Sequence, residues 1–156
     1  HLAKGPSMTD RFFEDFKVGD TFTSGGVTIT ESMILDFALT YDPQPFHIDV
    51  TAAKAGPFGG LIASGFQTLA LGFRQVLDLG VLKGGSMGSP GLDELRWTRP
   101  VRPGDTLRVK GEVVETKPSS SKADRGTVRI KYAFVTQTDE TVLTMSCIHI
   151  LKRRPA

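Results

Sequence analysis

The chain has 156 residues, 39% of them hydrophobic, which is enough for one globular domain with a core of its own. Its net charge of +2 gives no basic footprint for nucleic acid, and no apolar run is long enough to span a membrane. One cysteine, Cys147, and the lack of a secretory-type leader favour a reducing, cytoplasmic compartment. Three histidines, one of them at position 1, are too few for a zinc site. We therefore expect neither a nucleic-acid partner, nor a membrane, nor a metal.

The first methionine, Met8, follows a short segment that resembles the remnant of an expression tag. We expect residues 1–7 to be that remnant and residues 8–156 to form a single domain.

The first elements are expected to be a strand and a helix. Residues 21–30 are rich in β-forming residues, with a bend expected at the adjacent glycines Gly25 and Gly26. Thr30 can cap a helix that Pro43 ends. One apolar stripe of that helix is marked by residues at helical spacing: Ile34, Phe37, Ala38 and Tyr41.

The next stretch, residues 41–49 (YDPQPFHID), carries two prolines. Pro43 and Pro45 each disfavour helical backbone in the preceding residue, so a stiff, extended arm is expected here. Such an arm would hold Asp42 and His47 in fixed relative positions. One or two helical turns over residues 49–55 should follow.

A second long helix is expected between Ser64 and Gly80. Ser64 and Gln67 fit the S-x-x-Q capping box, and the apolar residues that follow predict a helix buried on most sides. Its apolar residues are Phe66, Leu69, Ala70, Leu71, Phe73, Val76, Leu77 and Leu79. The composition of residues 83–91 (KGGSMGSPG) predicts a mobile loop.

The C-terminal half predicts four strands joined as antiparallel hairpins, because apolar and polar residues alternate in it. The strands are expected in residues 92–101, 107–113, 128–134 and 143–151. The economical packing is an α+β fold in which a curved antiparallel sheet wraps round the apolar helix. Such a sheet leaves one edge strand unpaired, and a dimer in which that strand pairs with a second copy would cover it.

Asp42 and His47 could share a water and carry general acid–base chemistry near neutral pH. Alternatively, Asp42 caps a turn and His47 has no role, and residue types alone favour this second reading. If the Ser64 hydroxyl caps the helix, the Gly65 N–H stays free as an oxyanion donor, although taken alone this position is slightly better explained by an ordinary helix start with glycine for close packing.

An acid, an imidazole and an oxyanion donor together suit proton transfer beside a thioester carbonyl, with water added or removed at the β carbon. Other reactive side chains are expected to be structural. Cys147 and His149 are expected in the core, and Tyr41 as the last core contact of its helix. The three arginines near Trp97 could grip phosphates, but a solvated face is the default expectation: Arg96, Arg99 and Arg102.

Three motifs resemble one family in their order and spacing. Residues 41–49, the glycine-led helix at Ser64–Gly65 and residues 97–105 (WTRPVRPGD) are similar to the MaoC-like dehydratases, the (R)-specific enoyl-CoA hydratases. The resemblance spans residues 13–151. It implies a hot-dog fold, a homodimer or dimer of dimers, and coenzyme A thioester substrates without another cofactor.

The resemblance also implies roles for individual residues. Asp42 would be the principal acid/base, His47 its partner, and the Gly65 N–H the donor to the thioester oxygen. Water would add to C3 of a trans-2-enoyl thioester while C2 gains a proton, giving a (3R)-hydroxyacyl thioester. The residues expected to contact substrate are Gln44, Phe46, Phe58, Ser64 and Phe66.

Two positions depart from the family pattern. Gln44 stands where the signature has Asn, and Ser64 where characterised hydratases often have His, so a different acyl substrate is expected. Two alternatives are an acyl-CoA thioesterase and a non-catalytic acyl-CoA-binding domain. Neither of them requires the complete Asp42/His47 pair.

Overall fold

The computed structural model describes residues 9–156, so the assignment of residues 1–7 to a tag lies outside the described part. Within residues 9–156, no helix is long and apolar enough to cross a membrane.

An antiparallel sheet forms the body of the molecule, with the strand order β1-β4-β5-β6-β3, and β2 also pairs with β4. Its strands are β1 (Thr21–Thr23), β2 (Val27–Thr28), β3 (Leu92–Trp97), β4 (Thr106–Pro118), β5 (Arg125–Val135) and β6 (Thr141–Lys152). The break between β1 and β2 falls at Gly25 and Gly26, as predicted. The prediction that all four C-terminal strands form hairpins is wrong for β3, which pairs with β6 and ends as an edge strand. Sequence neighbours need not be sheet neighbours, and here the chain crosses between β3 and β4.

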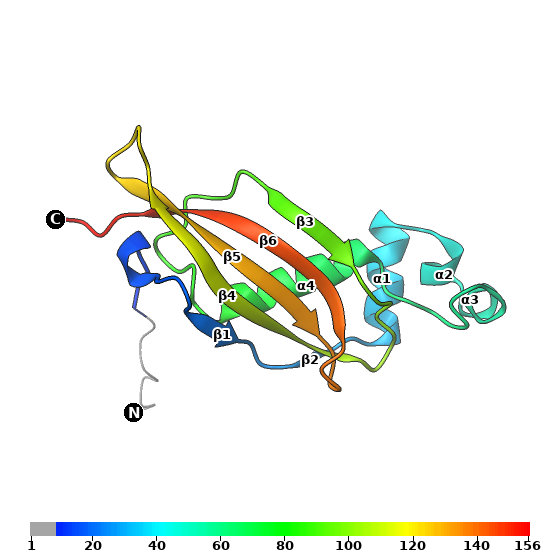
Figure 1. Ribbon diagram of the computed structural model, residues 1–156. Helices are drawn as coiled ribbons and strands as arrows, with labels where there is room; N and C mark the ends of the chain where they lie inside the picture. Colours follow the sequence, from blue (N-terminus) through cyan, green and yellow to red (C-terminus); the bar gives the residue numbers. More distant parts are fainter. Residues whose placement is uncertain (1–8) are drawn as a thin grey trace, which may run out of the picture.

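The helices are the short 3-10 turn η1 (Phe13–Asp15), α1 (Glu31–Tyr41), α2 (Pro45–Ile48), α3 (Val50–Ala55) and α4 (Gly65–Asp78). Figure 1 shows α4 lying along one face of the curved sheet, with α1, α2 and α3 gathered beyond one end of it. This is the expected α+β arrangement. Thr30 caps α1 as predicted, since its hydroxyl accepts from the Met33 N–H at 3.2 Å.

The core lies between α4 and the inner face of the sheet. Alternate residues of β5 are fully buried, as the pleat of a strand covered on one face requires. They include Val128, Ile130, Tyr132 and Phe134. Helix and sheet approach closely at Gly72, where an added Cβ would come within 2.1 Å of the Phe134 ring.

The apolar face of α4 is only partly buried, contrary to the prediction of a helix buried on most sides. Phe66, Phe73 and Leu77 are 63%, 40% and 46% exposed. The opposite face packs on the sheet and α1 with small or polar residues: Gln67, Thr68, Gly72, Gln75 and Val76. These polar side chains are tied to backbone; for example, Gln75 Nε2 donates to the Leu107 carbonyl at 2.8 Å. The helix therefore presents its apolar stripe outward.

The expectation for Tyr41 is also wrong. Tyr41 is 74% exposed and contacts the Phe37 ring at a centroid distance of 5.1 Å instead of ending the core stripe. Residues 83–91 are held along β6 by backbone bonds, including Met87 N–H to Ile150 O at 2.8 Å and Ile150 N–H to Gly88 O at 2.9 Å. Residues 83–91 form a loop, as predicted, and this loop is hydrogen-bonded to β6. Cys147 and His149 are buried as expected.

Candidate active site

Asp42 and His47 are brought together by a tight junction between two helices. Asp42 is the C-cap of α1, and its N–H donates to the Ala38 carbonyl at 2.9 Å. Pro45 occupies the first turn of α2, where its missing N–H costs nothing, and His47 follows within that same turn. The prediction of a fully extended arm is therefore wrong: Gln44 is extended, but a four-residue helix begins at Pro45.

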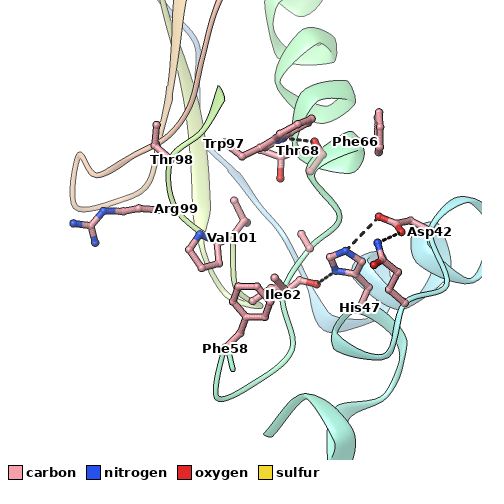
Figure 2. A pocket seen from close by; sticks show the side chains of 14 residues that line it. Asp42, His47, Phe58, Ile62, Phe66, Thr68, Trp97, Thr98, Arg99 and Val101 are labelled. Carbon is pink, nitrogen blue, oxygen red and sulfur yellow. Dashed lines mark hydrogen bonds and ion pairs between the residues drawn. The ribbon is translucent and has the colours of Figure 1, made fainter. Parts of the chain in front are cut away.

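The two reactive side chains face each other across 3.3 Å, measured from His47 Nε2 to Asp42 Oδ2. His47 is buried, and its other nitrogen, Nδ1, lies 2.7 Å from the Ile62 carbonyl oxygen. Because a carbonyl can only accept, Nδ1 must carry a proton and donate it. Nε2 is therefore the nitrogen that gains or loses a proton, and it points at the carboxylate (Figure 2).

Asp42 is held in its ionised form by hydrogen-bond donors. The Gln44 amide donates to Oδ1 at 2.6 Å, and the Ser64 hydroxyl donates to Oδ2 at 2.7 Å. The Gln44 hydrogen bond is the main cause of a pKa below the ordinary value for this carboxyl; the Ser64 hydrogen bond and the His47 charge act in the same direction against the effect of burial. Asp42 therefore faces the pocket as a carboxylate.

Ser64 does not cap α4, contrary to the predicted capping box. It is the N-cap residue, but its side chain makes no cap hydrogen bond, and the hydroxyl donates to Asp42 instead. Gly65 is the first residue of α4, so its N–H has no carbonyl of that helix to bond. A Cβ on Gly65 would meet the Trp97 ring at 2.5 Å, which explains the glycine by the close approach of an indole. Trp97 Nε1 in turn donates to the Gly65 carbonyl at 2.9 Å.

Asp42, His47 and Gly65 line one cavity of about 380 Å³. Figure 2 shows the acid and the imidazole on one side of it and Trp97 and Phe58 on others. Most of the wall is apolar, with contributions from Phe58, Ile62, Phe66, Trp97 and Val101. A mostly apolar cavity with a few convergent polar groups is the usual form of a small-molecule site.

The residues predicted to contact substrate divide into two groups. Gln44, Phe58 and Phe66 line the cavity. Phe46 is not among the lining residues; its ring packs against His47 and Phe58, with centroid distances of 4.5 and 5.4 Å. Ser64 is fully buried and reaches the site through Asp42.

Sequence reasoning missed three contributors. The Ile62 carbonyl orients His47, and no side-chain pattern reveals a backbone acceptor. Thr68 lines the cavity from the second turn of α4. Trp97 closes over Gly65, and its place in the WTRPVRPGD motif was the available signal.

The sequence of the chain matches a known family. The model of the MaoC like domain matches residues 15–134. The chain belongs to the MaoC-like domain family. Among curated relatives, 3-hydroxyacyl-thioester dehydratase Z of Mycobacterium tuberculosis is 37% identical over 72% of this chain and 74% of that protein. The 3-hydroxybutyryl-CoA dehydratase of Methylorubrum extorquens is 32% identical over 76% of this chain and 73% of that protein.

Solved structures support the same family and fold. A MaoC-like dehydratase from Rhodospirillum rubrum superposes with a TM-score of 0.86 at 38% identity, covering 93% of this chain and 99% of that one. The (R)-hydratase PhaJ1 of Pseudomonas aeruginosa superposes with a TM-score of 0.76 at 26% identity, covering 94% of this chain and 88% of that one. A Mycobacterium tuberculosis protein with a double hotdog fold superposes with a TM-score of 0.79 at 21% identity, covering 94% of this chain and 45% of that one. The MaoC-like chain therefore has the hot-dog fold.

Proposed function

We propose that this MaoC-like protein reversibly hydrates a trans-2-enoyl thioester to a (3R)-hydroxyacyl thioester. The observation that carries the proposal is the Asp42 carboxylate facing His47 Nε2 in the cavity that Gly65 also lines. Relatives named as dehydratases and an (R)-hydratase support the reaction class.

A water bound between Asp42 Oδ2 and His47 Nε2 is the nucleophile in this proposal. Its oxygen bonds to C3 of the enoyl group, and its proton passes to the Asp42/His47 pair. The pair delivers one proton to C2, so that the elements of one water add across the double bond. In the reverse direction the same groups remove the C2 proton and protonate the leaving hydroxyl.

The Gly65 N–H supplies the charge stabilisation that this reaction needs. Attack at C3 builds negative charge on the thioester oxygen, and an N–H at the start of α4 is a suitable donor for it. The apolar wall would take the acyl chain, with Phe58 and Phe66 on that wall. The reaction requires neither a metal nor a redox cofactor, and coenzyme A enters as part of the substrate.

We further propose a homodimer as the working unit, with a dimer of dimers as the larger form. The exposed apolar stripe of α4 lies beside the edge strand β3, and a groove between them is lined by Phe66, Phe73 and Leu92 among others. An edge strand next to exposed aromatic side chains is suited to pairing with a second copy.

Asp42→Asn tests the proposed reaction. The amide keeps the shape of the side chain but cannot act as the base, so hydration of a short trans-2-enoyl-CoA should slow by roughly 10²- to 10⁴-fold. The measurement is the loss of absorbance of the conjugated enoyl thioester. Asp36→Asn, on the exposed face of α1, is the matched control and should retain full activity.

Near-full hydratase activity in Asp42→Asn would overturn the mechanism. A thiol-trapping reagent in the same assay discriminates the thioesterase alternative, because a hydratase releases no free coenzyme A. Saturable binding of the thioester without any turnover of wild-type protein would instead indicate a binding domain.

A further inference from the structure

Ser64 occupies a helix N-cap without performing the usual task of that position. A serine there normally accepts a hydrogen bond from an N–H of the first turn, which stabilises a helix by about 1 kcal/mol. In this chain the fully buried hydroxyl makes no cap bond and donates to Asp42 Oδ2 at 2.7 Å. Helix α4 therefore lacks a side-chain cap, and the Asp42 carboxylate has the Ser64 hydroxyl as a hydrogen-bond donor.

The oxygen that Ser64 binds is the one that faces His47. Asp42 Oδ2 lies 3.3 Å from His47 Nε2, whereas Oδ1 accepts from the Gln44 amide. A carboxylate offers about four acceptor positions. Ser64 and Gln44 account for two of them, one on each oxygen, which leaves a position on Oδ2 for the water of the proposed reaction.

The Ser64 hydrogen bond also joins the two halves of the site. Asp42 ends α1, and Ser64 directly precedes Gly65 at the start of α4, 22 residues later in the chain. The carboxylate and the N–H of Gly65 are therefore connected through one side-chain hydrogen bond and one peptide unit. A displacement of α1 relative to α4 would have to break that bond.

We propose that Ser64 is a positioning residue that fixes Asp42 Oδ2 against His47 and in register with the Gly65 N–H. The inference rests on the proposed hydration and assigns Ser64 no contact with the reacting atoms. A purely structural serine would stabilise the protein without influencing the charge of Asp42, so the two roles differ in what they predict for proton binding.

The surroundings of Asp42 make its proton binding a clean readout. His47 is the one titratable side chain that contacts it within residues 9–156, and Gln44 and Ser64 are neutral. The adjacent Tyr41 points to solvent. Removing the Ser64 hydroxyl takes away a donor that favours the carboxylate, so the pKa of Asp42 should rise.

The experiment compares wild type with Ser64→Ala, Ser64→Thr and Ser24→Ala in the full chain. Ser24 is the matched control, because its buried hydroxyl is also hydrogen-bonded but lies at the other end of α4, where it accepts from the Val109 N–H at 2.8 Å. Two quantities are measured: the pKa of Asp42 by NMR titration of its carboxyl carbon, and the pH dependence of kcat and KM for enoyl-CoA hydration.

In Ser64→Ala the pKa of Asp42 should rise, the acidic limb of the kcat profile should move to higher pH, and kcat should fall roughly 10- to 100-fold with KM little changed. Ser64→Thr keeps a hydroxyl and should restore both quantities towards wild type. Ser24→Ala should lose stability but keep the wild-type pKa and profile.

An unchanged pKa of Asp42 in folded Ser64→Ala overturns the proposal, as does an equal change in Ser24→Ala. The NMR titration needs no turnover. If wild type hydrates no enoyl thioester but the pKa of Asp42 still depends on Ser64, the proposed function fails and the positioning role stands.

Discussion

Asp42 is a partly buried and His149 a buried ionisable side chain, and their surroundings favour opposite charge states. Asp42 has two neutral donors and an imidazole around it, which favour the charged form. Among residues 9–156, the His149 side chain is hydrogen-bonded to Tyr132, whose hydroxyl lies 2.8 Å from Nε2, and has the weak contact of Cys147 at 3.9 Å from Nδ1. Burial lowers the pKa of His149 to about 4, from an ordinary value of 6.5, so this imidazole is neutral.

The depressed pKa of His149 predicts a loss of stability in mild acid. Between pH 6.5 and about 4 the unfolded chain binds a proton at this position and the folded chain does not, so protonation favours unfolding. The free energy of unfolding should be fully retained above pH 6.5 and fall by about 3 kcal/mol by pH 4. Urea denaturation across this pH range measures it.

His149→Gln is the control for that loss. Glutamine can still pair with the Tyr132 hydroxyl but takes up no proton, so the difference in pH slope between variant and wild type isolates His149 from other acid-sensitive groups. Parallel slopes for the two proteins would contradict the prediction.

At the residue scale, the sequence predicted the Asp42/His47 pair but not its partners. Asp42 and His47 both belong to one stretch of six residues in a single motif, so their spacing in the sequence was enough to predict the pair. The Ser64 hydroxyl had two possible partners, a helix N–H nearby in sequence or a carboxylate distant in sequence. The prediction that Ser64 bonds the nearby helix N–H was wrong, because the packing of α1 against the start of α4 decides which partner the hydroxyl meets.

Among the elements, α4 is constrained most strongly at Gly72. Alanine is the better helix former, by about 1 kcal/mol, and would stabilise an isolated helix. Here its Cβ would lie 2.1 Å from the ring of Phe134, which is fully buried and has no room to yield. We expect Gly72→Ala to lower the free energy of unfolding by about 1–3 kcal/mol, measured by urea denaturation.

A double-mutant cycle identifies the cause of that loss. Phe134→Leu removes ring atoms that the new methyl group would strike, so Gly72→Ala should cost less in the Phe134→Leu background than in wild type. Strict additivity of the two changes would rule out this contact as the reason for the glycine.

The strands were predictable as elements because each alternates apolar and polar residues, and α1 because its cap and apolar spacing are local. The pairing of β3 with β6 was not predictable, because alternation shows which face of a strand is buried but not which strand lies beside it. Helix α2 was missed for a related reason: Pro45 can end an extended segment or start a helix, and the following chain decides which.

For the whole molecule, the outward apolar stripe of α4 predicts self-association. Phe73→Asp places a charge at the centre of that stripe and should shift the protein from dimer to monomer, as measured by light scattering after size exclusion or by sedimentation. Val18→Asp is the control, since Val18 is 65% exposed but lies outside α4 and β3, and should leave the mass unchanged. A wild-type monomer at all concentrations would contradict the dimer directly.

Trp97 gives the protein an optical property that follows from its position. It is the one tryptophan of the chain, it donates its indole N–H to the carbonyl of Gly65, and it sits on the edge strand beside the outward face of α4. Its ring also meets Phe66 at a centroid distance of 5.8 Å. Tryptophan fluorescence of this chain therefore originates from a single emitter located where the cavity and the exposed stripe of α4 meet.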